Sequence, residues 1–159
     1  MIKEKLQDAI NEQIIAEMWS ANLYLAMSFF MDKEGYPGMA HWLKEQWIEE
    51  NGHAFKLADY VIRRGGKAKV DKIDVVPNDF GTPLEVFEQV YKHERRVSEL
   101  IDKLVDVAIA EKDKATQDFL MEFVREQVEE ETTTSNIVEM IKKAGSTGVF
   151  FVDVKLGER

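Results

Sequence analysis

This chain contains 159 residues, 45% of them hydrophobic and 32% charged, which is enough apolar content for one globular domain with a substantial core. Its 30 acidic and 21 basic residues give a net charge of −9, which disfavours nucleic acid and membrane surfaces as partners. The lack of cysteine excludes disulfides, thiolate metal sites and a cysteine nucleophile, so a bound metal would need oxygen and nitrogen ligands. Charged residues near Met1 leave no apolar segment typical of a signal peptide, and we expect a cytoplasmic protein.

The first predicted element is a helix over about residues 3–33, because apolar residues recur every three or four positions until Gly35. Pro37, a residue type favoured in the first turn of a helix, begins a second helix over 37–64, which Gly65 ends. The connection between the two helices is short, so we expect them to pack antiparallel.

The next segment, residues 65–82, carries valine and isoleucine without helical spacing, and its length is sufficient for a crossover along a helical bundle. A third helix is predicted over 83–111, because Thr82 and Glu85 have the spacing of a capping box. This order makes the second and third helices run in the same direction.

The fourth predicted helix spans 114–144, with Asp113 as its cap and a glycine directly after its end. The apolar tail beyond it predicts a short docked helix at about 148–157 or a subunit contact. Together the elements predict one all-α domain over residues 1–159, a four-helix bundle in the order up, down, down, up.

Each of the four predicted helices has a potential metal ligand near its middle, at a position where the apolar series requires a buried residue. These residues are Glu17 in the first helix, Glu50 with His53 in the second, Glu94 in the third, and Gln127 with Glu130 in the fourth.

Carboxylates inside an apolar bundle cost several kcal/mol unless they are paired or bound to a metal. The same faces carry no lysine or arginine to neutralise them, so we expect a bound cation. A Glu-x-x-His pair by itself is usually a surface feature, but Glu50 and His53 are in phase with three other buried carboxylates. An oxygen-rich set of this kind favours iron or manganese over structural zinc.

Two further groups of residues each have two readings. Tyr24, two turns after Glu17, is either an ordinary core tyrosine or a phenol that donates an electron or orients a ligand beside the metal. The acidic run on the fourth helix is either a solvated face or, together with Glu49, a place for a further cation. His93, next to Glu94, is expected to point away from the cluster, toward the surface or an interface.

The segments that hold these residues are 11–24, 47–53 (WIEENGH), 91–94 (YKHE) and 126–131 (EQVEEE). In them the chain resembles the non-haem bacterial ferritins, and the resemblance extends over the whole sequence without gaps. It implies a ferritin-like bundle with a long crossover and a short fifth helix. It also implies a hollow shell of 24 identical subunits that oxidises Fe(II) with O2 or H2O2 and stores the Fe(III) as a mineral.

The resemblance also implies roles for individual residues. The implied first iron site and its bridge consist of Glu17, Glu50, His53 and Glu94. The implied second site uses Glu94, Gln127 and Glu130, with Tyr24 beside this di-iron centre. The implied third iron site, toward the interior of the shell, consists of Glu49, Glu126, Glu129 and Glu130.

Related families fit the chain less well. Haem is not expected, because Asn51 stands where bacterioferritins have their haem-ligating methionine. A cysteine-bound iron domain, as in rubrerythrins, is impossible here. The alternatives left open are a di-iron oxidase, a peroxide-detoxifying protein similar to the mini-ferritins, and a signalling bundle without metal.

Overall fold

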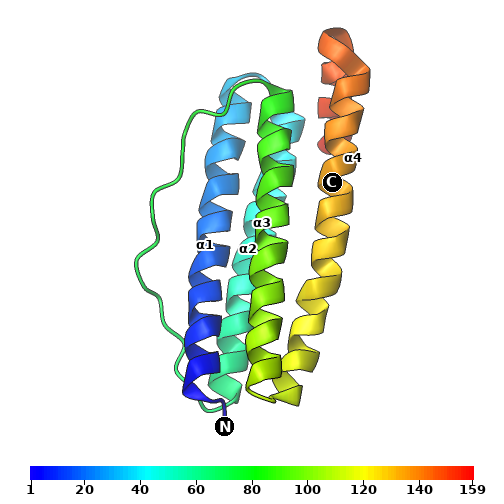
Figure 1. Cartoon of the computed structure of the whole chain (residues 1–159). Coiled ribbons are helices and arrows are strands. Elements are labelled where there is room, and N and C mark those ends of the chain that lie inside the picture. The colour runs from blue at the N-terminus through cyan, green and yellow to red at the C-terminus, as the bar shows by residue number, and fades with distance from the viewer.

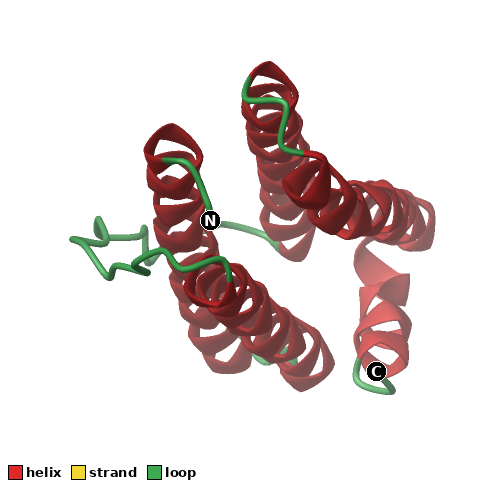
Figure 2. Cartoon of the chain, turned by 90° about the horizontal axis from the view of Figure 1, so that it is seen from below, coloured by secondary structure: helices red, strands yellow, loops and turns green.

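The computed structural model describes all 159 residues, which form helices and connecting loops without strands (Figures 1 and 2). The helices are α1 (Glu4–Lys33), α2 (Pro37–Arg63), α3 (Pro83–Ala110) and α4 (Lys114–Leu156). The predicted all-α four-helix bundle is therefore confirmed.

The four helices form two antiparallel pairs, α1 with α2 and α3 with α4, and these pairs have the most extensive contacts. The pairs meet through α1 against α3 and α2 against α4, so α1 and α4 are diagonal neighbours. In Figure 1, α1 and α4 rise from the end that holds the N-terminus, while α2 and α3 descend toward it. This is the up, down, down, up order expected from the long crossover.

Local interactions at the helix ends explain where the helices begin. The predicted capping box forms at α3, where the Glu85 amide donates to Thr82 Oγ1 at 3.2 Å and the Thr82 amide donates to Glu85 Oε2 at 2.7 Å. Asp113 Oδ1 likewise accepts a hydrogen bond from the Thr116 amide at 3.0 Å at the start of α4. Gly35, with φ of +88°, turns the chain between α1 and α2.

The crossover between α2 and α3 runs along the outside of α1 (Figure 1). Side chains of α1 bind its backbone: the Asn11 amide donates to Lys67 O at 2.9 Å, and Asn11 Oδ1 accepts from the Lys69 amide at 2.8 Å. Trp19 Nε1 donates to Val75 O at 3.3 Å. These contacts satisfy crossover backbone groups that have no strand partner.

The helix α4 contains a break at Gly145, whose φ of 66° and ψ of −171° are not helical. After this break the last helical segment leaves the direction of the bundle and packs against the start of α2 (Figures 1 and 2). Asp153 Oδ1 accepts a hydrogen bond from the Met39 amide at 2.8 Å, and a Cβ on Gly38 would lie only 1.8 Å from Asp153 O. The predicted fifth helix is thus present, and it begins directly after Gly145.

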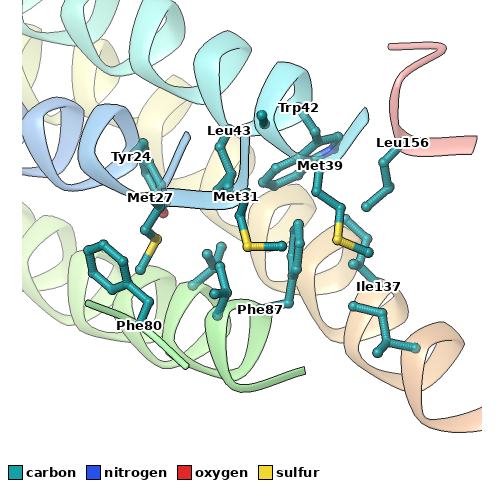
Figure 3. Close-up of a cluster of buried hydrophobic side chains, with 14 of the residues drawn as sticks. Tyr24, Met27, Met31, Met39, Trp42, Leu43, Phe80, Phe87, Ile137 and Leu156 are labelled. Carbon is teal, nitrogen blue, oxygen red and sulfur yellow. The ribbon is translucent and has the colours of Figure 1, made fainter. Parts of the chain in front are cut away.

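The apolar interior consists of two clusters separated by a polar layer. One cluster includes Tyr24, Met27, Met31, Met39, Trp42, Leu43, Phe80, Phe87, Ile137 and Leu156, drawn from all four helices and the crossover (Figure 3). The other cluster lies toward the end of the bundle that holds the N-terminus and includes Leu6, Ile10, Leu57, Ile101 and Leu120. Burial of each such side chain contributes about 1.5–3 kcal/mol, so the two clusters hold the helices firmly on both sides of the polar layer.

By length and composition alone, α1 would be able to cross a membrane, because one of its 18-residue windows has a mean hydropathy of 1.2. In the bundle, however, 56% of that window is buried against the other helices. The apolar character of α1 is that of a core helix.

Candidate metal centre

All four helices contribute to the polar layer in the middle of the bundle. Side chains from positions that interrupt the apolar series are buried there, with no residue more than 8% exposed: Glu17, Glu50, His53, Glu94 and Gln127. Each follows an uninterrupted helical stretch, so the backbone fixes the position of its Cβ atom.

The tightest group in this layer joins α1 and α2. Glu17, Glu50 and His53 each offer one ligand atom, and these atoms all lie within 4.8 Å of one another. His53 turns Nδ1 toward the group, 3.7 Å from Glu50 Oε1. Two carboxylates and one imidazole at these separations are able to surround a single divalent ion.

Glu94 lies opposite this group and is held by neutral donors from α1 and α4. The Tyr24 hydroxyl donates to Glu94 Oε1, and Gln127 Nε2 donates to Glu94 Oε2 at 3.1 Å. Tyr24 therefore hydrogen-bonds directly to one of the candidate ligands, while its ring belongs to the apolar cluster of Figure 3. Both of the roles considered for Tyr24 are compatible with this position.

Several oxygens in the layer have no hydrogen-bond partner. These atoms are Glu17 Oε2, both carboxylate oxygens of Glu50, and Gln46 Oε1. No lysine or arginine forms an ion pair with Glu17, Glu50 or Glu94. Because an unpaired buried carboxylate is strongly unfavourable, the chemistry of this donor set fits divalent cations such as Fe(II).

Burial without a lysine or arginine nearby raises the pKa values of the carboxyl groups in this layer. Burial raises the pKa of Glu17, and the neighbouring Glu50 raises it further. Burial also raises the pKa of Glu94, and burial together with the negative charges of Glu94 and Glu130 raises the pKa of Glu50 to about 8. Without metal, Glu50 therefore holds a proton near neutral pH, and metal binding releases it.

His53 shows the opposite balance between burial and charge. Burial by itself would lower the pKa of the imidazole, but a hydrogen bond to Glu126 and the negative charges of Glu17 and Glu126 raise it to about 9. His53 Nε2 lies 2.8 Å from Glu126 Oε2, on the side of the ring away from Glu50. A metal at Nδ1 must therefore displace a proton from His53 as well.

The four carboxylates of the implied third iron site do not converge as the inner group does. Glu49 Oε2 lies 2.9 Å from the guanidinium of Arg159, and Glu126 is bound to His53. Glu130 is half-buried and not fully buried as the helical periodicity predicted, and its Oε2 accepts a hydrogen bond from Gln46 Nε2 at 3.1 Å, while Glu129 is exposed. Burial raises the pKa of Glu130 to about 8, and the nearby charges of Glu94 and Glu49 add to this effect.

The sequence interpretation missed two residues that contact these groups. Gln46 lies one turn before Glu50 on α2 and is 1% exposed, so its position in the buried series could have identified it. Arg159 gave no such signal, because its contact with Glu49 depends on the return of the last helical segment. The guanidinium also donates to Trp42 O at 3.0 Å and lies 4.7 Å from the centre of the Trp42 ring.

His93, which the sequence predicted at the surface or an interface, is half-buried against α1. Its Nε2 lies 2.8 Å from Ser20 Oγ, and its ring packs against Trp19 and Tyr24 with centroid distances of 5.5 and 5.8 Å. Burial lowers the pKa of His93 to about 4, so the imidazole is neutral at physiological pH.

Comparison with known proteins gives consistent matches along the chain. The family described as Ferritin-like domain matches residues 7–144. A bacterial non-heme ferritin of Bacteroides fragilis (strain 638R) is 68% identical over 159 residues, which cover 100% of both chains. A bacterial non-heme ferritin of Staphylococcus epidermidis (strain ATCC 35984) is 37% identical over 145 residues, covering 91% of this chain and 87% of the relative.

Solved structures match over the same length. An open pore ferritin from the hyperthermophilic archaeon Archaeoglobus fulgidus superposes with a TM-score of 0.97 at 42% sequence identity. The match covers 100% of this chain and 99% of the archaeal one, so it includes the crossover and the last helical segment.

Proposed function

This chain belongs to the bacterial non-haem ferritins, a family of iron-storage proteins, and from that premise we propose that it is also a ferroxidase that oxidises Fe(II) at the buried carboxylate layer. The observation that carries the proposal is the set of oxygens on Glu17 and Glu50 that have no hydrogen-bond partner and no lysine or arginine beside them. Two Fe(II) ions entering this layer would supply the missing positive charge.

In the proposed arrangement the inner group binds the first Fe(II). This group consists of Glu17, Glu50 and His53, whose ligand atoms lie within 4.8 Å of one another. Glu94 would contact both ions, with Gln127 and Glu130 completing the second position. The hydrogen bond from Tyr24 to Glu94 supports a role for the phenol beside the bound iron.

The reaction balances with two Fe(II) for each oxidant molecule. Two Fe(II) give one electron each to O2, and two protons complete H2O2; with H2O2 as the oxidant, two electrons and two protons yield two water molecules. The chain's part is to hold both ions and to release the protons that its carboxyl groups and His53 carry before metal binds.

Storage then requires the oxidised iron to leave the layer and enter a closed shell. We propose a third iron position at the rim, formed by Glu49, Glu126, Glu129 and Glu130. The 24-subunit shell and the cytoplasmic location belong to this proposal, supported by full-length similarity to ferritins from bacteria and an archaeon.

An oxidase for organic substrates would need an apolar hollow beside the metal ligands. A surface hollow lies at the end of the bundle, against Tyr60, Arg64 and Phe119, and none of the metal-ligand candidates lines it. The structure thus favours small inorganic substrates over the organic alternative, and the family assignment argues against a signalling bundle.

The test is an anaerobic titration of the metal-free protein with Fe(II), followed by oxygen, with ferric absorbance and particle size measured on the same sample. We expect saturable binding of two to three Fe(II) per subunit and a particle of about 24 subunits. Glu50→Ala should slow oxidation about 100-fold while leaving particle size unchanged, because it removes a metal ligand and no subunit contact.

The matched control is Glu88→Ala, which removes an exposed carboxylate of α3 outside the layer and should oxidise Fe(II) like the unmodified protein. Unchanged initial rates in Glu50→Ala would contradict the proposed site.

A further inference from the structure

Glu126 makes a contact that its implied part in the third iron site does not require. Its Oε2 lies 2.8 Å from His53 Nε2, whereas the other ring nitrogen, Nδ1, faces Glu50 Oε1 at 3.7 Å. The His53 side chain is 10% exposed and that of Glu126 is 38% exposed, so the contact is shielded at the histidine end. The ring therefore connects the inner group on one side with Glu126 on the other.

A histidine binds a metal through one ring nitrogen, and the partner of the other nitrogen decides which one is free. A carboxylate that accepts from Nε2–H keeps the remaining proton there, which leaves the Nδ1 lone pair for the metal. The ring of His53 is held further by Phe123, at a centroid distance of 5.6 Å and an angle of 61°. The contacts with Phe123 and Glu126 thus hold the orientation of the His53 ring, and the contact with Glu126 favours the tautomer with a proton on Nε2.

We propose that Glu126 is the positioning residue of His53, which aims Nδ1 at the Fe(II) held by Glu17 and Glu50. This inference rests on the proposed ferroxidase function and gives Glu126 a role in the first iron site that is separate from any contact with a third iron. Loss of such a partner lowers metal affinity by about 10- to 100-fold in other histidine sites.

Glu129 provides the matched comparison. It belongs to the same implied third set on α4, but it is exposed and has no hydrogen bond or ion pair with His53. Removing Glu129 therefore removes one carboxylate of the third set and leaves the His53 contact intact. A glutamine at position 126 keeps an oxygen that is able to accept from Nε2–H, so it separates the hydrogen bond from the negative charge.

The experiment is anaerobic Fe(II) calorimetry on the assembled protein and on the variants Glu126→Ala, Glu126→Gln and Glu129→Ala, with particle size as a control for assembly. We expect Glu126→Ala to weaken the tightest Fe(II) site about 10- to 100-fold and Glu126→Gln to restore most of that loss. Glu129→Ala should weaken only the third equivalent.

If Glu126→Ala instead behaves like Glu129→Ala, with the tightest site unchanged, Glu126 acts on the third iron alone and the inference is wrong. Failure of the unmodified protein to bind two Fe(II) saturably would instead overturn the proposed function, so the two failures are distinguishable.

Discussion

Two polar groups of the bundle differ in their counter-charge: one contains an arginine, and the other contains no lysine or arginine. At the end of the bundle, the Arg64 guanidinium lies 2.9 Å from Asp113 Oδ2, and Tyr60 and Thr116 complete the hydrogen-bonded group. In the middle, Glu17 and Glu50 have oxygens without any partner. Arg64 holds the pKa of Asp113 at about 2, whereas burial raises the pKa of Glu50 to about 8.

The difference in counter-charge indicates a different role for each of the two groups. The Arg64 group contains its own cation, so it is complete in the metal-free chain and joins the end of α2 to the start of α4. The middle layer has no lysine or arginine, so the metal-free chain buries its carboxyl groups at the expense of stability. The same helices carry a structural ion pair and, several turns away, a site that only an external cation completes.

The largest stability effect is expected at the complete group. Asp113→Ala removes both the cap of α4 and the partner of Arg64, and should lower the free energy of unfolding by about 1–2 kcal/mol. Calorimetric melting measures this loss, with the exposed Asp102→Ala as the control. Slower Fe(II) oxidation in Asp113→Ala would break the comparison, because the two groups would then be coupled.

The pH dependence of the metal-free protein should report the incomplete layer. The raised pKa values of Glu50, Glu130 and His53 mean that the folded chain retains protons which the unfolded chain releases above about pH 4.5 for the glutamates and about pH 6.5 for the histidine. That stabilisation is lost as pH rises through about 8 and 9, so the melting temperature should fall between pH 6.5 and 8. The lowered pKa of His93 acts only below this window.

Glu50→Gln should flatten this decline, since the amide does not ionise, and bound Fe(II) should reduce it under anaerobic conditions. An equally steep decline in Glu50→Gln would show that the pH dependence arises elsewhere in the molecule.

The smallest effect is expected at the outer carboxylates of the layer, where Glu49 already forms an ion pair with Arg159. Arg159→Gln should strengthen binding of the third Fe(II) about two- to fivefold, because Fe(II) no longer competes with the partly exposed ion pair. Anaerobic calorimetry measures the change, and Lys155→Gln, an exposed cation in the same segment, is the control. Equal third-site affinity in both variants would mean that Arg159 does not compete with metal.

The sequence was sufficient to predict both the fold and the burial of the inner residues, because both follow from helical periodicity. Helical periodicity places Glu17, Glu50 and Glu94 in series with core residues, and a bundle must bury those series. The capping box at Thr82 and the cap at Asp113 are local patterns, so the sequence predicted them too. The roles of these residues in iron binding remain predictions.

The partners of the outer carboxylates could not be predicted, because they depend on contacts between distant residues. Arg159 reaches Glu49 from 110 positions away along the chain, and only after the turn at Gly145 redirects the last segment. Periodicity identifies the face of a helix that is buried, but it does not determine which side chain a half-exposed carboxylate binds. The sequence therefore identified Glu126 as part of an acidic helix face, but it did not predict the contact between Glu126 and His53.

The position of the last residue also has a practical consequence for genetic fusions. The backbone carbonyl of Arg159 lies 2.9 Å from His41 Nε2, and its side chain is bound to Trp42 and Glu49, so a peptide added after it would begin inside this contact. Met1, in contrast, is fully exposed at the end of the bundle where α1 begins, away from the C-terminus (Figure 1). Purification tags and fused cargo should therefore be attached at Met1, where they leave the carboxylate layer and its rim undisturbed.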